Sequence, residues 1–98
     1  MNYNLSALGV PSGAWAQSSE VTFELIKSEG IETVKQFVLG PFSRSVPSGY
    51  TSSLIIIDPR EEPAKSPEDL GYRDRVVCDL YHRRLVLIIA YSSLKLSK

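Results

Sequence analysis

The sequence predicts a mainly β protein: a small single-domain antiparallel sheet of four or five strands, barrel-like or sandwich-like, with one or two short helical turns. Three observations support this fold class. Residues 51–58 and 85–91 are apolar on both faces, which is typical of covered strands. Residues 20–26 alternate between apolar and polar side chains, as in a half-buried strand. Glycine and proline recur in the segments between them, as expected for loops.

Length and composition limit the function classes. The 98 residues suffice for one domain, and 43% hydrophobic with 22% charged residues is close to globular averages. A formal net charge of zero argues against a general nucleic-acid-binding protein, which usually carries a basic surplus. The charges are nevertheless uneven, because six bases face two acids from Tyr72 onward and five acids face two bases in 58–69. Such asymmetry favours self-association or docking on an anionic surface.

Residues 1–19 are expected to form a flexible N-terminal arm ahead of a single β-rich domain at 20–98, because no helical or strand period runs through them. Trp15 would then anchor the arm on the domain or contact a neighbouring subunit. No charged region precedes an apolar core at the N-terminus, so we expect no secretory signal. Cys78 is the single cysteine and cannot form an internal disulfide, so we expect a cytoplasmic protein.

Residues 20–26 and 31–39 are expected to pair as a hairpin. Gly30 supplies the left-handed residue that a three-residue hairpin loop needs. A second interpretation stays open, in which 31–39 is a helix that stops at Gly40 and Pro41. That helix would place four apolar side chains on one face: Ile31, Val34, Phe37 and Val38.

The second half of the chain is expected to hold the remaining strands. Residues 51–58 predict a strand that ends at Pro59, and an acidic, solvated loop follows at 60–71. Within that loop, Ser66 and Pro67 predict one or two helical turns, with the serine as the cap. The last third, 75–96, predicts either two strands joined at 82–84 or one long bent strand.

The sequence offers little that could carry catalysis. One cysteine and one histidine cannot supply the four ligands of a closed zinc site. On a strand, Cys78 and His82 would lie about 13 Å apart, too far for the proton transfer that a cysteine nucleophile requires. The glycines lack the spacing of a phosphate-binding loop. We therefore expect no enzyme activity, no metal, no cofactor and no small-molecule substrate.

The apolar surplus on so small a sheet predicts that a second copy completes one face. We expect a small non-enzymatic protein of an accessory or structural type, a homo-oligomer whose interface is its C-terminal strand. Six residues are the expected interface: Trp15, Leu85, Leu87, Ile89, Tyr91 and Leu94. The β-rich layout resembles small viral accessory and matrix proteins in composition, although no motif carries this resemblance.

A second interpretation makes the protein a membrane-surface module that binds anionic lipid, or an RNA-binding module. Both functions would use the basic residues of the C-terminal third. Four arginines are the anion-binding candidates: Arg73, Arg75, Arg83 and Arg84. The competing explanation is that these arginines pair with the acidic loop that precedes them and with Glu24, Glu29 or Glu32, at little gain or cost in stability.

Overall fold

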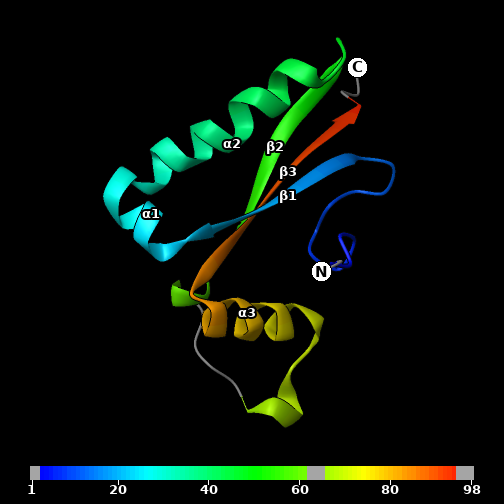
Figure 1. Ribbon diagram of the computed structural model, residues 1–98. Helices are drawn as coiled ribbons and strands as arrows, with labels where there is room; N and C mark the ends of the chain where they lie inside the picture. The colour runs from blue at the N-terminus through cyan, green and yellow to red at the C-terminus, as the bar shows by residue number, and fades with distance from the viewer. Residues whose placement is uncertain (1–2, 62–65, 95–98) are drawn as a thin grey trace.

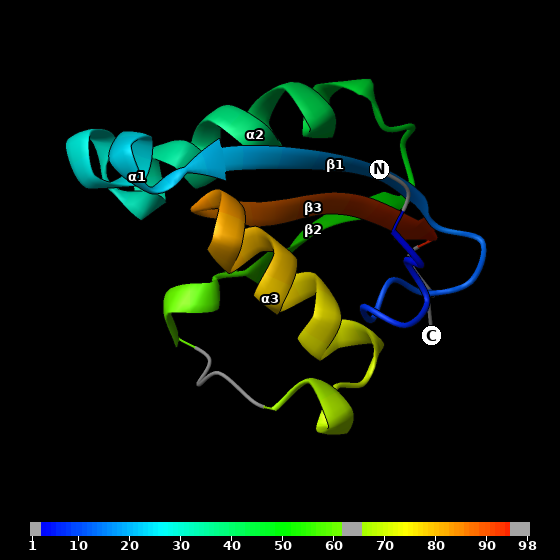
Figure 2. The same ribbon diagram turned by 60° about the horizontal axis from the view of Figure 1, so that its bottom comes forward.

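The computed structural model describes residues 3–61 and 66–94, which form a three-stranded antiparallel sheet with helices on both faces (Figures 1 and 2). The elements follow in this order: β1 (Trp15–Thr22), α1 (Phe23–Glu29), α2 (Ile31–Ser45), β2 (Tyr50–Ile57), the 3₁₀ turns η1 (Pro59–Glu61) and η2 (Pro67–Asp69), α3 (Tyr72–Arg83) and β3 (Leu85–Leu94). The strand order is β1-β3-β2. The last strand of the chain therefore lies in the middle of the sheet.

The expected mainly β fold with four or five strands is wrong. The described residues form three strands in one open sheet, with 45% helix and 30% strand, and neither a barrel nor a sandwich. The two strands expected at 51–58 and 85–91 are confirmed as β2 and β3. Residues 62–65 of the expected acidic loop, and 95 and 96 at the end of the expected last strand, lie outside the described residues.

The expected hairpin of 20–26 with 31–39 is replaced by a helical hairpin. β1 ends at Thr22, whose hydroxyl accepts a hydrogen bond from the Leu25 N–H (3.2 Å) and so caps α1. Gly30 does adopt a positive φ of 86°, but it joins α1 to α2 instead of two strands. The helical interpretation of 31–39 holds, and α2 continues through Pro41 to Ser45 instead of stopping at Gly40.

The expected strand before 82–84 is also a helix. Val76, Val77 and Leu80 are all buried on the sheet-facing side of α3, a spacing that suits a helix. The same residues allow a period of two, because Val76 and Leu80 would share one face of a strand. Burial against the sheet decided between the two patterns. The expected joint at 82–84 does separate two elements. Ser66 does precede the short turn η2, but its hydroxyl donates a hydrogen bond to Asp69 Oδ2 (2.7 Å) and the expected backbone cap is not seen among the described residues.

The core has two layers, one on each face of β3. Leu87 and Ile89 belong to the apolar cluster shared with α3 and the N-terminal segment, whereas Val86 and Ile88 belong to the cluster shared with α1 and α2. Figure 2 shows α3 on one side of the sheet and α2 on the other. All four side chains are fully buried. Residues 85–91 are therefore apolar on both faces because helices cover both sides of the sheet.

The segment expected to be a flexible arm packs into this core. Leu8 and Val10 are buried beside Leu80, and the first five residues of β1 belong to the same segment. The Tyr3 hydroxyl donates a hydrogen bond to Glu20 Oε1 on β1 (2.6 Å). The segment before β1 is thus held by apolar burial and by at least one polar contact.

Because both faces of β3 are covered, we expect truncation of a core side chain on either face to destabilise the protein to a similar extent. We expect Leu87→Ala, on the α3 side, and Ile88→Ala, on the α2 side, each to lower the free energy of unfolding by about 2–5 kcal/mol, because each leaves a cavity in a closed core. Gln17→Ala, at an exposed position of β1, is the control and should change it by less than about 0.5 kcal/mol. Urea denaturation measures all three. A small effect at either core position would mean that this face of the sheet is open.

The Tyr3 contact predicts an alkaline transition. Burial raises the pKa of Tyr3 to about 12, and its hydrogen bond to Glu20 acts in the same direction. Because the folded pKa lies above the ordinary value of about 10, the stabilisation is complete below pH 10 and is lost as the pH rises towards 12. We expect the stability difference between the wild type and Tyr3→Phe to shrink across this window in urea denaturation. A constant difference would contradict the docked position of Tyr3.

Candidate functional site

One edge of the sheet lacks the features that usually protect an edge strand. β2 pairs with β3 on one side, and none of its eight residues, Tyr50–Ile57, is charged or proline. Leu54, Ile55 and Ile56 are only half-buried, whereas the β3 residues opposite them are fully buried or nearly so. Native edge strands usually carry charges, prolines or bulges that prevent further pairing. The β2 edge is therefore open to another strand.

The opposite edge, β1, has a different character. Gln17, Ser18 and Glu20 are exposed along it. Glu20 also accepts the Tyr3 hydrogen bond and pairs with Arg83 at 3.6 Å. A polar edge with a charged side chain resists pairing with a second copy. The two edges of the sheet are thus chemically distinct.

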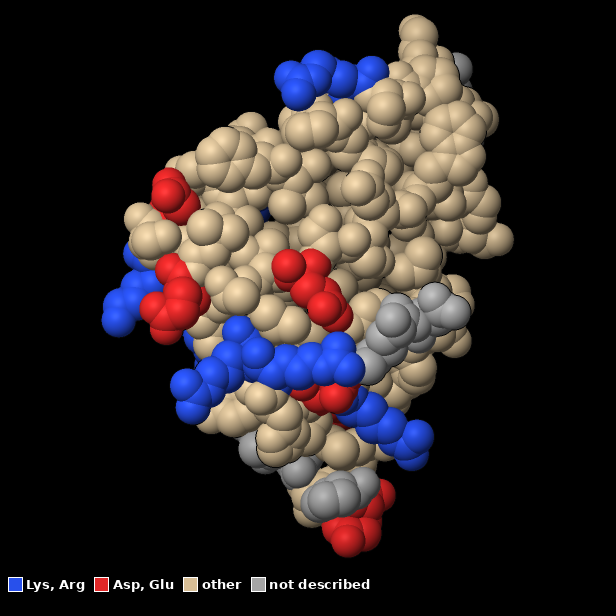
Figure 3. Space-filling model, in the orientation of Figure 1, with Lys and Arg blue, Asp and Glu red and all other residues tan. Residues whose placement is uncertain are grey.

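An aromatic patch, formed by Trp15, Tyr50 and Leu94, lies where β2 begins. The Trp15 and Tyr50 rings stack with their centroids 5.0 Å apart and 9° between planes. They come from the two edge strands and meet beside Ser92 of β3, whose small side chain is fully buried. Trp15 is 51% and Leu94 60% exposed. Figure 3 shows most charged side chains of one face in a band across its middle and lower parts, with one basic group at the top and one acid at the upper left.

The structure divides the six expected interface residues. Trp15 and Leu94 are exposed in the patch, whereas Leu87 and Ile89 are fully buried in the core. Leu85 and Tyr91 are half-buried on the α3 side. β3 is paired with β1 from Leu85 to Ser92 and with β2 from Leu87 to Leu94, so few of its backbone groups are left for another strand. The β2 edge was missed because its continuous apolarity was interpreted as cover on both faces.

The four anion-binding candidates fall into two places. Arg73 and Arg75 lie in the first turn of α3, and Arg83 and Arg84 lie at its other end, on the order of 16 Å away along the axis. The Arg83 guanidinium pairs with Glu20 at 3.6 Å and with Asp79 at 3.5 Å. Among the described residues, Arg83 thus pairs with β1 and its own helix, not with the acidic loop as expected.

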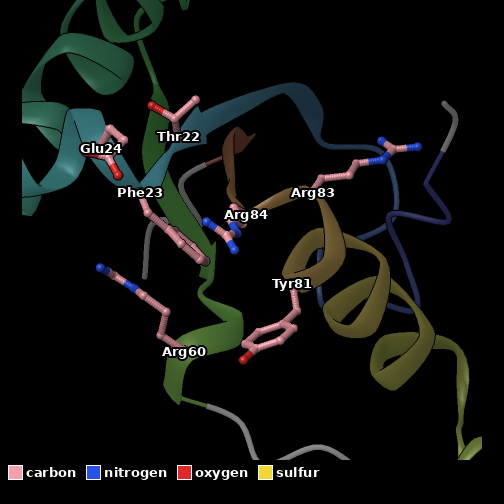
Figure 4. A pocket seen from close by; sticks show the side chains of 7 residues that line it. All are labelled: Thr22, Phe23, Glu24, Arg60, Tyr81, Arg83 and Arg84. Atoms are coloured by element: carbon pink, nitrogen blue, oxygen red, sulfur yellow. The ribbon is translucent and has the colours of Figure 1, made fainter.

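Arg84 lines a hollow of about 550 Å³ at the junction of three chain segments: the start of α1, the end of β2 with η1, and the turn from α3 into β3 (Figure 4). Its lining residues are Thr22, Phe23, Glu24, Arg60, Tyr81, Arg83 and Arg84. The backbone there is fixed by two contacts, since the Arg84 N–H donates to the Tyr81 carbonyl (3.0 Å) and the Arg84 carbonyl accepts from the Phe23 N–H (3.3 Å). These contacts join the end of α3 to the start of α1.

Arg60 forms the opposite side of the hollow. Its Nε and Nη2 donate to the two carboxylate oxygens of Asp58, at 2.9 Å and 2.6 Å. These hydrogen bonds lower the pKa of the Asp58 carboxyl, although burial of Asp58 acts in the opposite direction, and they raise the pKa of Arg60. The Arg60 guanidinium also lies over the Phe23 ring, 4.8 Å from its centroid. Arg60 is therefore held in one orientation by a carboxylate and a ring.

Cys78 and His82 lie one turn apart on α3, so the strand spacing of about 13 Å does not apply to them. Cys78 is half-buried and His82 is exposed, with its ring edge-on to Tyr81 at 6.4 Å. Nothing in the described part of the chain links the thiol to the ring by a hydrogen bond.

The described residues also contain no group of three or more side chains that could hold a metal ion. Within 3–61 and 66–94, no helix has the length and apolar character that crossing a bilayer requires.

Comparison of the chain with protein-family models, with curated proteins and with solved structures finds no match.

The backbone of Arg84 predicts an unusual response to glycine. Arg84 has φ 57° and ψ 46°, a left-handed conformation that glycine adopts without steric cost. We expect Arg84→Gly to raise the free energy of unfolding by about 0.5–1 kcal/mol, because relief of strain exceeds the greater freedom of glycine in the unfolded chain. The matched change Arg83→Gly, one residue earlier and still helical, should lower it by up to about 1 kcal/mol. Urea denaturation distinguishes the two, and a loss of stability in both would contradict the assigned backbone.

Proposed function

We propose that this chain is a self-associating binding protein that forms a homodimer by pairing β2 with β2 of a second copy. The supporting observation is the uncharged β2 edge, along which Leu54, Ile55 and Ile56 stay half-exposed. Antiparallel pairing about a two-fold axis would join the two sheets into one continuous sheet. The same contact would cover these three side chains on both faces of the joined sheet.

The dimensions of the edge suit such an interface. Eight residues of antiparallel strand span about 27 Å, and no proline interrupts the backbone donors. Pairing over the full length would place the aromatic patch of one copy beside the end of β2 in the other. Association must offset a cost of roughly 4–15 kcal/mol in lost freedom, so the patch contributes apolar area that the strand edge alone lacks.

The middle position of β3 changes what the C-terminal strand would contribute. The strand holds β2 in place through its pairing from Leu87 to Leu94, and it adds Leu94 to the patch. Its apolar run is used inside the monomer. The proposed contact therefore lies on the neighbouring strand instead of on the C-terminal strand itself.

A charge placed at the β2 edge should separate the copies. Ser53 on β2 and Ser18 on β1 have the same side-chain type and lie on the same face of the sheet, on opposite edges. We expect a dimer mass for the wild type in light scattering at micromolar concentration. Ser53→Lys should raise the dissociation constant about tenfold or more, because two lysines would face each other near the two-fold axis.

Ser18→Lys adds the same charge at the polar edge and should leave the dimer intact. A monomeric wild type would overturn the proposal. Equal effects of the two substitutions, or dissociation by Ser18→Lys alone, would also exclude β2 as the interface.

A further inference from the structure

Arg84 is a cation without a partner in the described part of the chain. No hydrogen bond, ion pair or ring contact involves its guanidinium within 3–61 and 66–94. Figure 4 shows its side chain pointing into the hollow, between Phe23 and Tyr81, whereas the Arg83 side chain points away from it. Arg83 is neutralised by Glu20 and Asp79. Of these two adjacent arginines, one stabilises the fold and the other faces solvent inside a hollow.

The position of Arg84 has a conformational cost that no internal contact of its side chain offsets. A non-glycine residue in the left-handed region is disfavoured by roughly 1–2 kcal/mol, and the residue after a helix is commonly glycine for this reason. Strained backbone of this kind clusters at ligand sites. The guanidinium is the group that glycine would lack. The Arg84 guanidinium is therefore available to a ligand in the hollow, whereas its backbone ends α3.

Further donors border the same opening. Asp58 uses Nε and Nη2 of Arg60, so the third nitrogen, Nη1, has no partner among the described residues. Stacking on Phe23 fixes the plane of this guanidinium. Tyr81 is 58% exposed, and Figure 4 shows its hydroxyl on the side of the hollow that faces Arg60. Glu24 is the acid among the residues that line the hollow, and it lies at the start of α1 beside Phe23.

The geometry favours a phosphate group over a carboxylate. Donors from Arg84, Arg60 and Tyr81 approach from different elements, and a tetrahedral phosphate can accept hydrogen bonds from several directions, whereas the two oxygens of a carboxylate lie in one plane. The hollow of about 550 Å³ is larger than a phosphate alone and leaves room for an attached group. Aromatic side chains on its wall suit a planar ring.

We infer that this hollow binds a small phosphate monoester, with the phosphate on Arg84 and the organic part against Phe23 and Tyr81. A small ligand fits better than a nucleic-acid strand or a lipid surface. Arg73 and Arg75 lie at the far end of α3, so they do not extend the hollow into a continuous basic stripe. This site is separate from the β2 edge and does not depend on dimer formation.

Calorimetric titration of the full chain tests the inference with three probes: inorganic phosphate, ribose 5-phosphate and adenosine 5′-monophosphate. We expect weak binding of phosphate and about tenfold tighter binding of the aromatic monoester. Arg84→Gly should abolish binding without loss of the fold, because glycine suits the backbone there. Arg75→Ala removes the same charge at the far end of α3, outside the hollow, and should keep the affinity within about twofold.

Absence of binding by all three probes would overturn the proposed site. Equal weakening of binding in the two arginine variants would also overturn it, because that would indicate a general effect of charge. Tighter binding of a single-stranded oligonucleotide, or of vesicles with anionic lipid, than of the monoester would overturn the assignment of a small ligand. Ser53→Lys should bind the monoester as the wild type does. This variant separates failure of the phosphate site from failure of the proposed dimer.

Discussion

The structure depends on the complete burial of β3. Its residues from Val86 to Ala90 are at most 1% exposed, so both faces and both edges of this strand must be covered. β1 and β2 cover the edges, the α1–α2 hairpin covers one face, and α3 with the N-terminal segment covers the other. Burial of several large aliphatic side chains, at about 25 cal/mol per Å² of apolar area, is the largest favourable term that this small chain has. The order of the other elements around β3 follows from it.

The two candidate sites are consequences of this arrangement. With the most apolar strand in the middle, the second most apolar strand, β2, becomes an edge whose aliphatic side chains are covered on one side only. To enter the middle of the sheet, the chain must turn sharply after α3, and the left-handed residue Arg84 makes that turn. The same turn brings the ends of β1 and β2 beside the end of α3, which forms the hollow. The placement of one strand thus generates both an unpaired edge and a basic hollow.

Sequence patterns predicted the two most apolar strands, β2 and β3, and failed where a strand period and a helix period coincide. Residues 85–91 and 51–58 have no helical alternative of sufficient length, and both are strands. Val76 and Leu80 fit a strand face and a helix face equally well, so only the packing against the sheet could decide for α3. Gly30 was correctly expected to have a positive φ, although a hairpin and a helical connection both use such a residue. Arg84 was a candidate from its charge, but Phe23 and Arg60 reach it only through the topology, for which no local pattern exists.

The net charge of zero illustrates how far composition can limit function. It argues against a broad electrostatic footprint, because charges beyond about 8 Å are screened at physiological salt. At shorter distances, the electrostatic environment of a charged side chain is set by the charges next to it. Asp58 neutralises Arg60, Glu20 and Asp79 neutralise Arg83, and Glu32 pairs with Lys35 at 3.1 Å. Arg84 has no such neighbour among the described residues, and it stands in a hollow with aromatic walls. A chain without net charge can therefore leave individual cations unpaired, as at Arg84, since each pairing depends on the neighbouring charges and not on the sum over the chain.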